Sequence, residues 1–162
     1  MNPLRLADVA ATDALGAALA RTLPTPAVVH LHGDLGAGKS TLARALLREL
    51  GVTGAIRSPT YTLVERYPLA AGGEAWHLDL YRIADAGELE YLGLDEDRVV
   101  LWLVEWPERG SGGLPPADLV VGMAVNHNGR RAQLTAGSPA GQAWLLRLAE
   151  AMSATAGFAG DS

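Results

Sequence analysis

The only lysine of this chain, Lys39, stands inside a glycine-rich octapeptide, GDLGAGKS, at positions 33–40. This octapeptide matches the pattern G-x-x-x-x-G-K-[S/T], in which glycines let the backbone curl so that several N–H groups point at a chain of phosphates. The lysine adds a mobile positive charge for the β- and γ-phosphates, and the hydroxyl of Ser40 can ligate Mg²⁺. Given the residue frequencies of this chain, a chance match has odds of about one in a thousand. The motif therefore predicts a nucleotide-phosphate site.

Glycine is expected at two positions of this loop for steric reasons, because a β-carbon at Gly36 or Gly38 would crowd the turn. A helix that begins where the loop ends would direct the positive end of its dipole at the same anion. The residues predicted to contact the phosphates are Gly33, Asp34, Leu35, Gly36, Ala37, Gly38, Lys39, Ser40 and Thr41.

Hydrolysis of a bound nucleotide also needs a carboxylate near the metal and a group that orders the attacking water. Glu105 directly follows the apolar segment 99–104. Ligand-facing groups of doubly wound α/β proteins lie at such strand ends, so we predict that Glu105 is a magnesium ligand. The alternative is an acid that caps a helix or turn.

Two further polar residues are candidates for the same site. Asp79 lies in the apolar and aromatic segment HLDLY, where an unpaired carboxylate is costly unless it faces a ligand or a partner. The alternative for Asp79 is a salt bridge to Arg82 or Arg66. Thr60, which follows a Ser-Pro pair, could place its hydroxyl on the metal or the γ-phosphate, or it could be an ordinary threonine at the start of a strand.

Hydrophobic periodicity predicts the elements that must position these residues. We expect an opening helix over 6–23, or a shorter one capped by Thr12 or Asp13, and a last helix over 144–152. Between them, the expected elements are a strand at 27–32, a helix at 39–50, strands at 60–67 and 75–81 around a turn at 70–74, a short helix at 85–92, a central parallel strand at 99–104, and a hairpin of 119–125 with 131–135.

Length and composition exclude several classes of protein. The 162 residues carry a net charge of −5 and scattered arginines, so a basic face for nucleic acid is not expected. No apolar run approaches the ~20 residues of a membrane span, and the absence of cysteine excludes disulfides and thiolate metal sites. We expect a cytoplasmic protein without membrane contact, with one domain over 1–152 and a flexible tail over 153–162.

Four segments together resemble the TsaE family, also called YjeE, of the tRNA threonylcarbamoyladenosine pathway. They are GDLGAGKST at 33–41, SPTYTLVERY at 58–67, HLDLYR at 77–82 and LVEWPERG at 103–110, in the order found in the family. The three later segments are far more specific than the phosphate-binding loop, which many unrelated proteins share. The resemblance covers most of the chain.

This resemblance implies a three-layer α/β P-loop ATPase with a mostly parallel central sheet and antiparallel additions. It implies ATP and Mg²⁺ as cofactors and the proteins TsaD and TsaB as partners. ATP hydrolysis would reset the TsaD–TsaB complex, and tRNA would be contacted only through that complex. By motif, Ser40 and Glu105 would hold magnesium, Thr60 would be a switch-like threonine and Asp79 would support hydrolysis. The resemblance also implies three nucleotide contacts outside the loop, at Thr12, Trp106 and Arg130. Ser40 stands where the family's threonine is expected, and either hydroxyl can ligate magnesium.

Three other functions are compatible with a phosphate-binding loop of this kind. A small-molecule kinase shares this loop but usually carries an arginine-bearing lid, for which no arginine-dense insertion is evident. A GTPase is disfavoured because its [N/T]-K-x-D motif needs a second lysine. The third alternative is a nucleotide-gated adaptor that binds ATP and a partner but hardly hydrolyses ATP; Asp79 and Glu105 argue against it.

Other conspicuous residues have structural explanations. His30 and His32 alternate along a strand and are expected in hydrogen bonds or in the core, since two histidines without a third ligand seldom bind metal. Trp76, Trp102 and Trp144 are expected in the core, and no role is assigned to Tyr61 or Tyr81.

Overall fold

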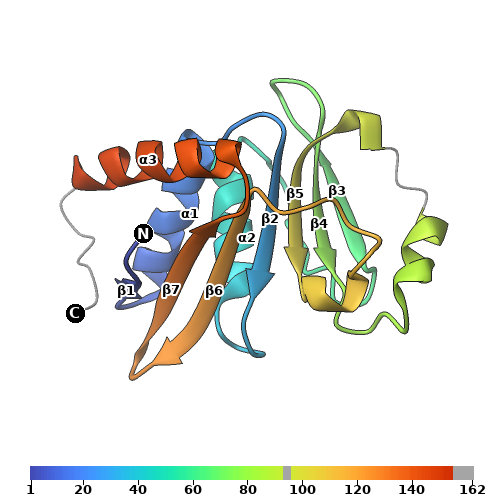
Figure 1. Ribbon diagram of the computed structural model, residues 1–162, viewed down its shortest axis with the longest axis horizontal. Helices are drawn as coiled ribbons and strands as arrows, with labels where there is room; N and C mark the ends of the chain where they lie inside the picture. The colour runs from blue at the N-terminus through green and yellow to red at the C-terminus, as the bar shows by residue number, and fades with distance from the viewer. Residues whose placement is uncertain (93–95, 155–162) are drawn as a thin grey trace.

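The computed structural model describes residues 1–92 and 96–154 and contains a mixed α/β fold around one seven-stranded sheet (Figure 1). The strand order is β1-β7-β6-β2-β5-β4-β3. The strands are β1 (Leu4–Leu6), β2 (Ala27–His32), β3 (Val64–Pro68), β4 (Glu74–Asp79), β5 (Val99–Glu105), β6 (Leu119–Asn126) and β7 (Gly129–Ala136). The helices are α1 (Val9–Arg21), α2 (Lys39–Glu49) and α3 (Pro139–Ser153), with 3₁₀ turns at Ala86–Leu92, Glu96–Arg98 and Pro107–Gly110.

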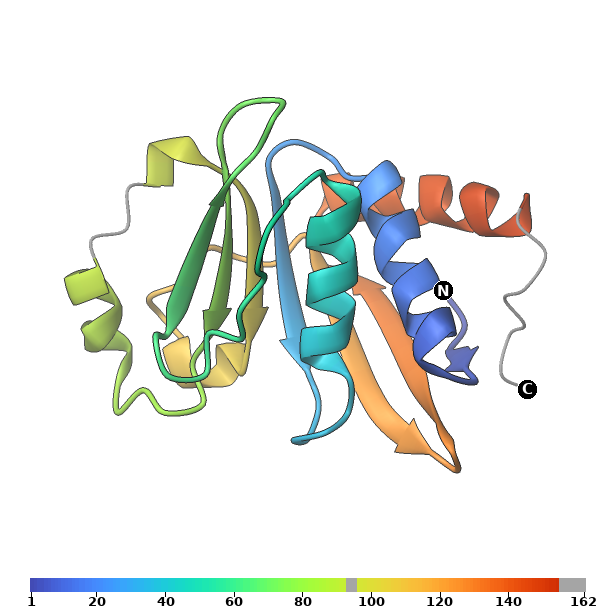
Figure 2. The ribbon, with the colours of Figure 1, turned by 180° about the vertical axis from the view of Figure 1, so that it is seen from behind.

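The centre of the sheet is parallel and its edges are antiparallel. β2 pairs in parallel with both β5 and β6, and β4 pairs in parallel with β5. β3, β7 and β1 add antiparallel pairs at the two edges. Helices α1 and α2 cover one face, seen in front of the strands in Figure 2, and the connection over 111–118 lies on the other face. Helix α3 runs along one end of the sheet beside α1, and its buried residues Trp144, Leu148 and Met152 join the same core as α1 and α2. The predicted α/β class with a parallel core and antiparallel additions is confirmed.

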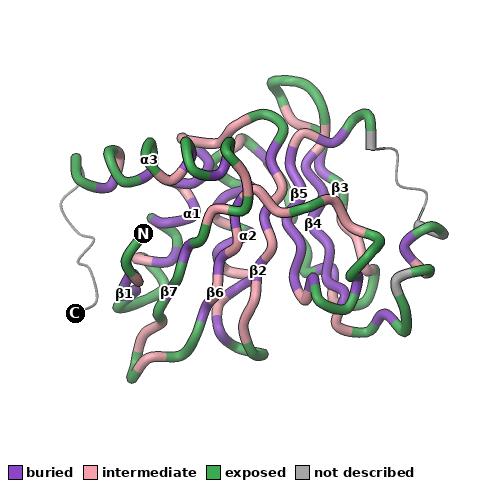
Figure 3. Tube along the Cα trace, in the orientation of Figure 1, coloured by how far each residue is buried: buried purple, intermediate pink, exposed green. Residues whose placement is uncertain are grey.

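Strand β5 is buried on both faces, as a central parallel strand should be. Its side chains alternate: Leu101 and Leu103 join the core beneath α1 and α2, while Trp102 and Val104 join a second core on the opposite face. The buried stretches of β4 and β5 are continuous along the chain trace (Figure 3). The expected core positions of Trp76, Trp102 and Trp144 are confirmed, since these residues are 1%, 5% and 0% exposed.

The first helix differs from the prediction. Leu4 and Leu6 are both buried and form β1 beside β7, so an edge strand precedes the helix. Asp8, and not Thr12 or Asp13, caps α1: its carboxylate accepts a hydrogen bond from the Ala11 N–H at 2.9 Å. A period-two burial pattern over three residues is too short to be distinguished from one turn of helix.

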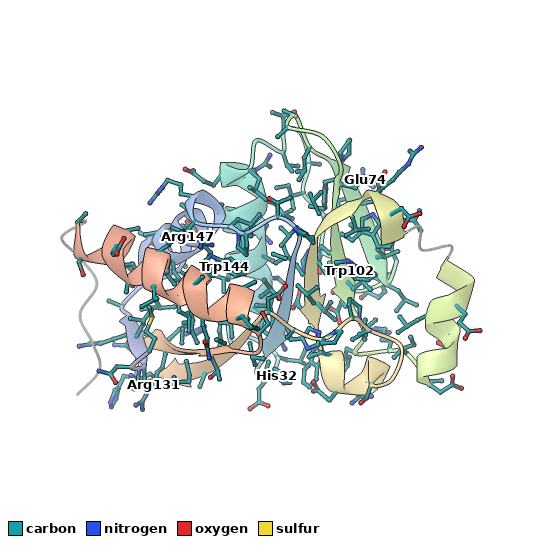
Figure 4. All side chains as sticks on the ribbon, turned by 45° about the horizontal axis from the view of Figure 1, so that its top comes forward. His32, Glu74, Trp102, Arg131, Trp144 and Arg147 are labelled. Atoms are coloured by element: carbon teal, nitrogen blue, oxygen red, sulfur yellow. The ribbon has the colours of Figure 1, made fainter. Side chains whose placement is uncertain are left out.

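The last helix starts five residues earlier than the predicted 144. Ser138 caps it by accepting a hydrogen bond from the Gly141 N–H at 3.0 Å, and Pro139 occupies the first turn, where a missing N–H costs nothing. Trp144 and Arg147, labelled in Figure 4, both project from this helix. Each donates a hydrogen bond to Thr22, at the end of α1, which ties α3 to α1. Ser153 ends α3, and the remaining tail residues 155–162 lie outside the described residues.

Other boundaries shift by a few residues. The strand expected at 60–67 begins only at Val64, because the chain turns over 59–63 and Leu63 adopts φ 67° with its N–H bonded to the Pro59 carbonyl oxygen. The short acidic helix over 85–92 is present as a 3₁₀ turn. Within the described residues, none of the helices has the length and apolar character that crossing a membrane requires.

Candidate nucleotide site

The loop between β2 and α2 curls because three of its glycines adopt left-handed backbone angles. Gly33, Gly36 and Gly38 have φ values of 145°, 83° and 102°. A β-carbon at Gly38 would lie 3.1 Å from the Met123 side chain, but one at Gly36 would meet nothing within 4 Å. The predicted crowding is therefore wrong for Gly36. The positive φ is what favours glycine there.

The loop ends at the N-terminus of α2. Gly38 is the N-cap residue and offers no side chain to the free N–H groups of the first turn. Those donors, together with the positive end of the helix dipole, are therefore available to an anion. Leu35 to Thr41 line a cavity of about 260 Å³ at this point, and Gly33 and Asp34 form the turn that leads into it. The backbone arrangement suits a chain of phosphates.

Lys39 is the first residue of α2 and is only 4% exposed, so it does not stand in a solvent-facing loop. Its ammonium group donates a hydrogen bond to the Gly33 carbonyl oxygen and lies 3.9 Å from the centre of the Trp106 ring. Burial lowers the pKa of the Lys39 ammonium, and the negative charges of Glu105 and Asp79 oppose that shift. An anion bound in the cavity would favour the charged form in the same way.

Ser40 and Glu105 meet across the cavity from different elements. The Ser40 hydroxyl lies 3.1 Å from each carboxylate oxygen of Glu105, which is the last residue of β5. Glu105 is 2% exposed, and β5 is held beside β2, whose end leads into the loop. A hydroxyl and a carboxylate at the mouth of a phosphate loop are oxygen ligands of the type that Mg²⁺ prefers.

Asp79 is brought beside Glu105 by strand pairing. The two residues are direct partners in the β4–β5 ladder, and both side chains line the cavity. One oxygen of Asp79 accepts a hydrogen bond from the Tyr81 N–H at 3.0 Å, and the other lies 3.4 Å from the Thr60 hydroxyl. The Asp79 carboxylate is therefore a buried acidic group at the edge of the cavity, since the residue is only 7% exposed.

Trp106 closes one side of the cavity in an unusual backbone conformation. Its φ of 56° and ψ of 50° are left-handed, which is uncommon for a bulky residue and typical of functional sites. The ring packs against Tyr81, with centroids 4.9 Å apart, and against the Lys39 ammonium. The turn at Glu105–Pro107 therefore aims Trp106 at the phosphate loop.

A second cavity of about 160 Å³ adjoins the first, between the start of α1 and the β6–β7 hairpin. Its lining includes Thr12, which is 3% exposed, and Asn128. Gly38, Thr41 and Arg130 line both cavities, so the two lie side by side. Thr12 therefore lies apart from the phosphate loop, whereas Arg130 reaches it and donates a hydrogen bond to the Gly36 carbonyl oxygen at 3.2 Å.

Two residues near the site were assigned no role from the sequence. Asp8 lines the second cavity while it caps α1. His77 lies 2.6 Å from Glu105 and is 2% exposed. The signal for His77 was its spacing of two from Asp79, which puts both side chains on the same face of a strand.

His30 and His32 lie outside this cluster, on the same strand as expected. His32, the last residue of β2, pairs with the Glu108 carboxylate at 3.5 Å and is labelled in Figure 4. Burial lowers the pKa of His30, partly offset by a hydrogen bond with the backbone of Pro115.

Known proteins resemble this chain over most of its length. The family described as "Threonylcarbamoyl adenosine biosynthesis protein TsaE" matches residues 6–133. A TsaE protein of Haemophilus influenzae is 46% identical over 111 residues, which cover 67% of this chain and 70% of the relative. One of Aquifex aeolicus is 35% identical over 122 residues, covering 74% and 84%.

The fold also matches a solved structure. The crystal structure of Bacillus subtilis YdiB superposes with a TM-score of 0.75 at 25% identity, covering 93% of this chain and 95% of that one. Because the family match spans most of the described residues and relatives of this identity cover two thirds of the chain or more, the chain belongs to the TsaE family of threonylcarbamoyl adenosine biosynthesis proteins.

Proposed function

We propose that this protein binds ATP with Mg²⁺ at the phosphate loop and hydrolyses it as a component of the machinery that makes threonylcarbamoyladenosine in tRNA. The observation that carries the proposal is the meeting of Lys39, Ser40 and Glu105 at one cavity in front of the α2 N-terminus. A buried ammonium, a hydroxyl and a carboxylate in that arrangement have no evident structural purpose but fit a metal-bound triphosphate.

The metal fits the groups that are present. The Ser40 hydroxyl and the Glu105 carboxylate supply two oxygen ligands, and Mg²⁺ usually takes one or two protein oxygens together with phosphate oxygens and water. When bound, the ion neutralises charge on the phosphates. Lys39 has to leave the Gly33 carbonyl oxygen to contact the β- and γ-phosphates.

Asp79 is our candidate for ordering the attacking water. Its hydrogen bond from the Tyr81 N–H fixes the carboxylate, and its other oxygen faces the Thr60 hydroxyl inside the cavity. A fixed acceptor at this point can hold a water molecule for attack on the γ-phosphate. Contact between Thr60 and that phosphate would then change the conformation of the turn over 59–63.

The second cavity is our candidate for the ribose and the base. It lies beside the phosphate cavity and shares the lining residues Gly38, Thr41 and Arg130 with it. The buried Thr12 hydroxyl supplies a polar group at its far side, and the Arg130 guanidinium lies between the two cavities. Thr12 and Arg130 would therefore contact the nucleoside part of ATP.

We further propose that hydrolysis acts on a protein partner, and that the partner is the TsaD–TsaB complex. Tyr61 follows Thr60, which lines the phosphate cavity, and is 82% exposed, so this turn offers an aromatic contact next to the cavity. Because Thr60 contacts Asp79, loss of the γ-phosphate can change the turn that carries Tyr61. The net charge of −5 supports tRNA contact through partners and not directly.

The test is the ATPase rate and co-elution of this protein, alone and with TsaD and TsaB, in the ATP and ADP states. We expect slow hydrolysis alone, marked stimulation by both partners together, and tighter association with ATP than with ADP. Full activity alone without nucleotide-dependent association would indicate an independent enzyme such as a small-molecule kinase. Association with ATP without any turnover would indicate a nucleotide-gated adaptor.

A further inference from the structure

His77 is a buried histidine in direct contact with the carboxylate of the candidate metal site. Its Nε2 lies 2.6 Å from Oε2 of Glu105, and the two side chains are 2% and 3% exposed. A buried carboxylate is costly unless donors satisfy it. Within the described residues, the side chains that hydrogen-bond to Glu105 are His77 and Ser40, and the contact to His77 is the shorter, at 2.6 Å against 3.1 Å.

The sheet holds His77 in this position. β4 and β5 run in parallel, with His77 opposite Leu103 and Asp79 opposite Glu105. His77 and Asp79 therefore lie on the face of β4 that points toward α2, while Trp76 packs in the core on the other face. Glu105 lies two residues beyond Leu103 on β5, and the imidazole reaches along the strand pair to it. The pairing of the two strands leaves the imidazole little freedom to turn away.

The tautomer of His77 follows from its surroundings. A carboxylate only accepts hydrogen bonds, so Nε2 has to carry the proton that lies between His77 and Glu105. The other nitrogen, Nδ1, is buried and has no hydrogen-bond partner in the part of the chain that the structure describes. A hydrogen bond to a charged acceptor is stronger than a neutral one, so the bond at Nε2 offsets part of the cost of burying Nδ1 without a partner.

We infer that His77 is a positioning residue for the metal site, an inference that rests on the proposed magnesium role of Glu105. His77 binds Oε2 and thereby orients the carboxylate so that Oε1 and the Ser40 hydroxyl face the phosphate cavity together. Groups that orient a metal ligand in this way typically contribute about 10- to 100-fold to metal affinity. His77 itself touches neither the nucleotide cavity nor the metal position.

Two variants separate this role from packing. His77→Leu fills the space without a donor, whereas His77→Gln puts an amide N–H close to the position of Nε2. The measurement is calorimetric titration of ATP with and without Mg²⁺, after circular dichroism and thermal unfolding have established the fold. We expect His77→Leu to reduce the magnesium enhancement of ATP affinity about tenfold and to keep the magnesium-free affinity. We expect His77→Gln to restore most of the lost enhancement.

His30→Leu is the matched control, because it also removes a histidine with one buried, unpartnered ring nitrogen from a central strand. The histidine contact to Glu105 comes from His77 and not from His30. It should leave the magnesium enhancement unchanged. If wild-type protein shows magnesium enhancement and His77→Leu retains it, the positioning role is overturned. If wild-type protein shows no enhancement, the magnesium assignment itself is overturned, and this inference with it.

A spectroscopic measurement keeps the inference testable if His77→Leu fails to fold. Ring-nitrogen NMR of the wild-type protein should find His77 with a hydrogen-bonded Nε2–H, and Glu105→Gln should shift that signal because the charged acceptor is lost. A proton on Nδ1 with Nε2 bare, or a signal indifferent to Glu105→Gln, would overturn the inference.

Discussion

Ser40 and Glu105 are 65 positions apart in the chain, yet the Ser40 hydroxyl lies 3.1 Å from both carboxylate oxygens of Glu105. One residue belongs to the first turn of α2 and the other to the last position of β5, and the parallel pairing of β2 with β5 brings them together. This contact defines the candidate metal position.

Lys39→Ala should weaken ATP binding by roughly 10- to 100-fold, because charge-assisted hydrogen bonds contribute about 1.5–3 kcal/mol each. Lys39→Arg should also bind poorly, since a planar guanidinium does not fit where a compact ammonium is enclosed by Trp106 and the loop. Calorimetric titration measures both affinities. Because Lys39 is buried, the thermal unfolding of each variant must also be measured, to establish that the variant is folded. Unchanged affinity in a folded Lys39→Ala protein would remove the phosphate-loop assignment.

Glu105→Gln should lower the magnesium-dependent part of ATP affinity, because the amide keeps the shape of the side chain and loses the charge that attracts the ion. The partners His77 and Ser40 can still hydrogen-bond to the amide oxygen, so the fold should survive. Titrations of ATP at several Mg²⁺ concentrations check the result. An identical magnesium response in wild type and variant would argue for a capping role of Glu105.

Asp79→Asn should mainly slow turnover and leave ATP affinity nearly unchanged, because the side chain faces the cavity beside Thr60 and is not paired with Ser40. The readouts are the single-turnover hydrolysis rate and the dissociation constant. Thr60→Val is the companion variant, which removes the hydroxyl that contacts Asp79. If Asp79→Asn only unfolds the protein, Asp79 is a structural residue and its proposed role is wrong.

Adenine nucleotides should bind better than guanine nucleotides. The guanine motif of GTPases needs a lysine, and the only lysine of this chain is at the phosphate loop. A competition assay of ATP and ADP against GTP and GDP decides the question. In the same assay, Arg130→Ala should weaken all four nucleotides, because Arg130 borders both cavities. A preference for guanine would contradict the proposed ATPase function.

Gly16→Ala should destabilise the protein by about 1–3 kcal/mol, although alanine favours helices. The new methyl group would lie 2.6 Å from the Ala45 β-carbon and 2.9 Å from the Leu42 carbonyl oxygen, where α1 packs closely on α2. Denaturant unfolding measures the loss. The double variant Gly16→Ala with Ala45→Gly removes the first of these clashes and should recover part of the stability; a double variant as unstable as the sum of both changes would show that the helices do not meet here.

The amino-acid sequence by itself determined the elements whose signals are local. The strand over 27–32, the loop that follows and the start of α2 at Lys39 are found as predicted, because the glycine pattern, the apolar run and the helical spacing act within a few residues. Glu105 was found for the same reason, since the apolar run before it marks the end of a strand. The prediction missed the short edge strand β1, which forms by pairing with β7. It also placed the start of α3 too late, because the Ser138 cap sets that start.

Only the tertiary structure decided which side chains share the site. The bond from His77 to Glu105, the ladder pairing of Asp79 with Glu105 and the position of Arg130 beside both cavities all depend on the sheet order, which places β4, β5 and β2 side by side and β6 next to them. Gly36 shows the same limit, because the sequence indicated a glycine but not whether space or backbone angle required it. The physical reason is that strand order and register arise from long-range pairing and packing, which local propensities do not encode.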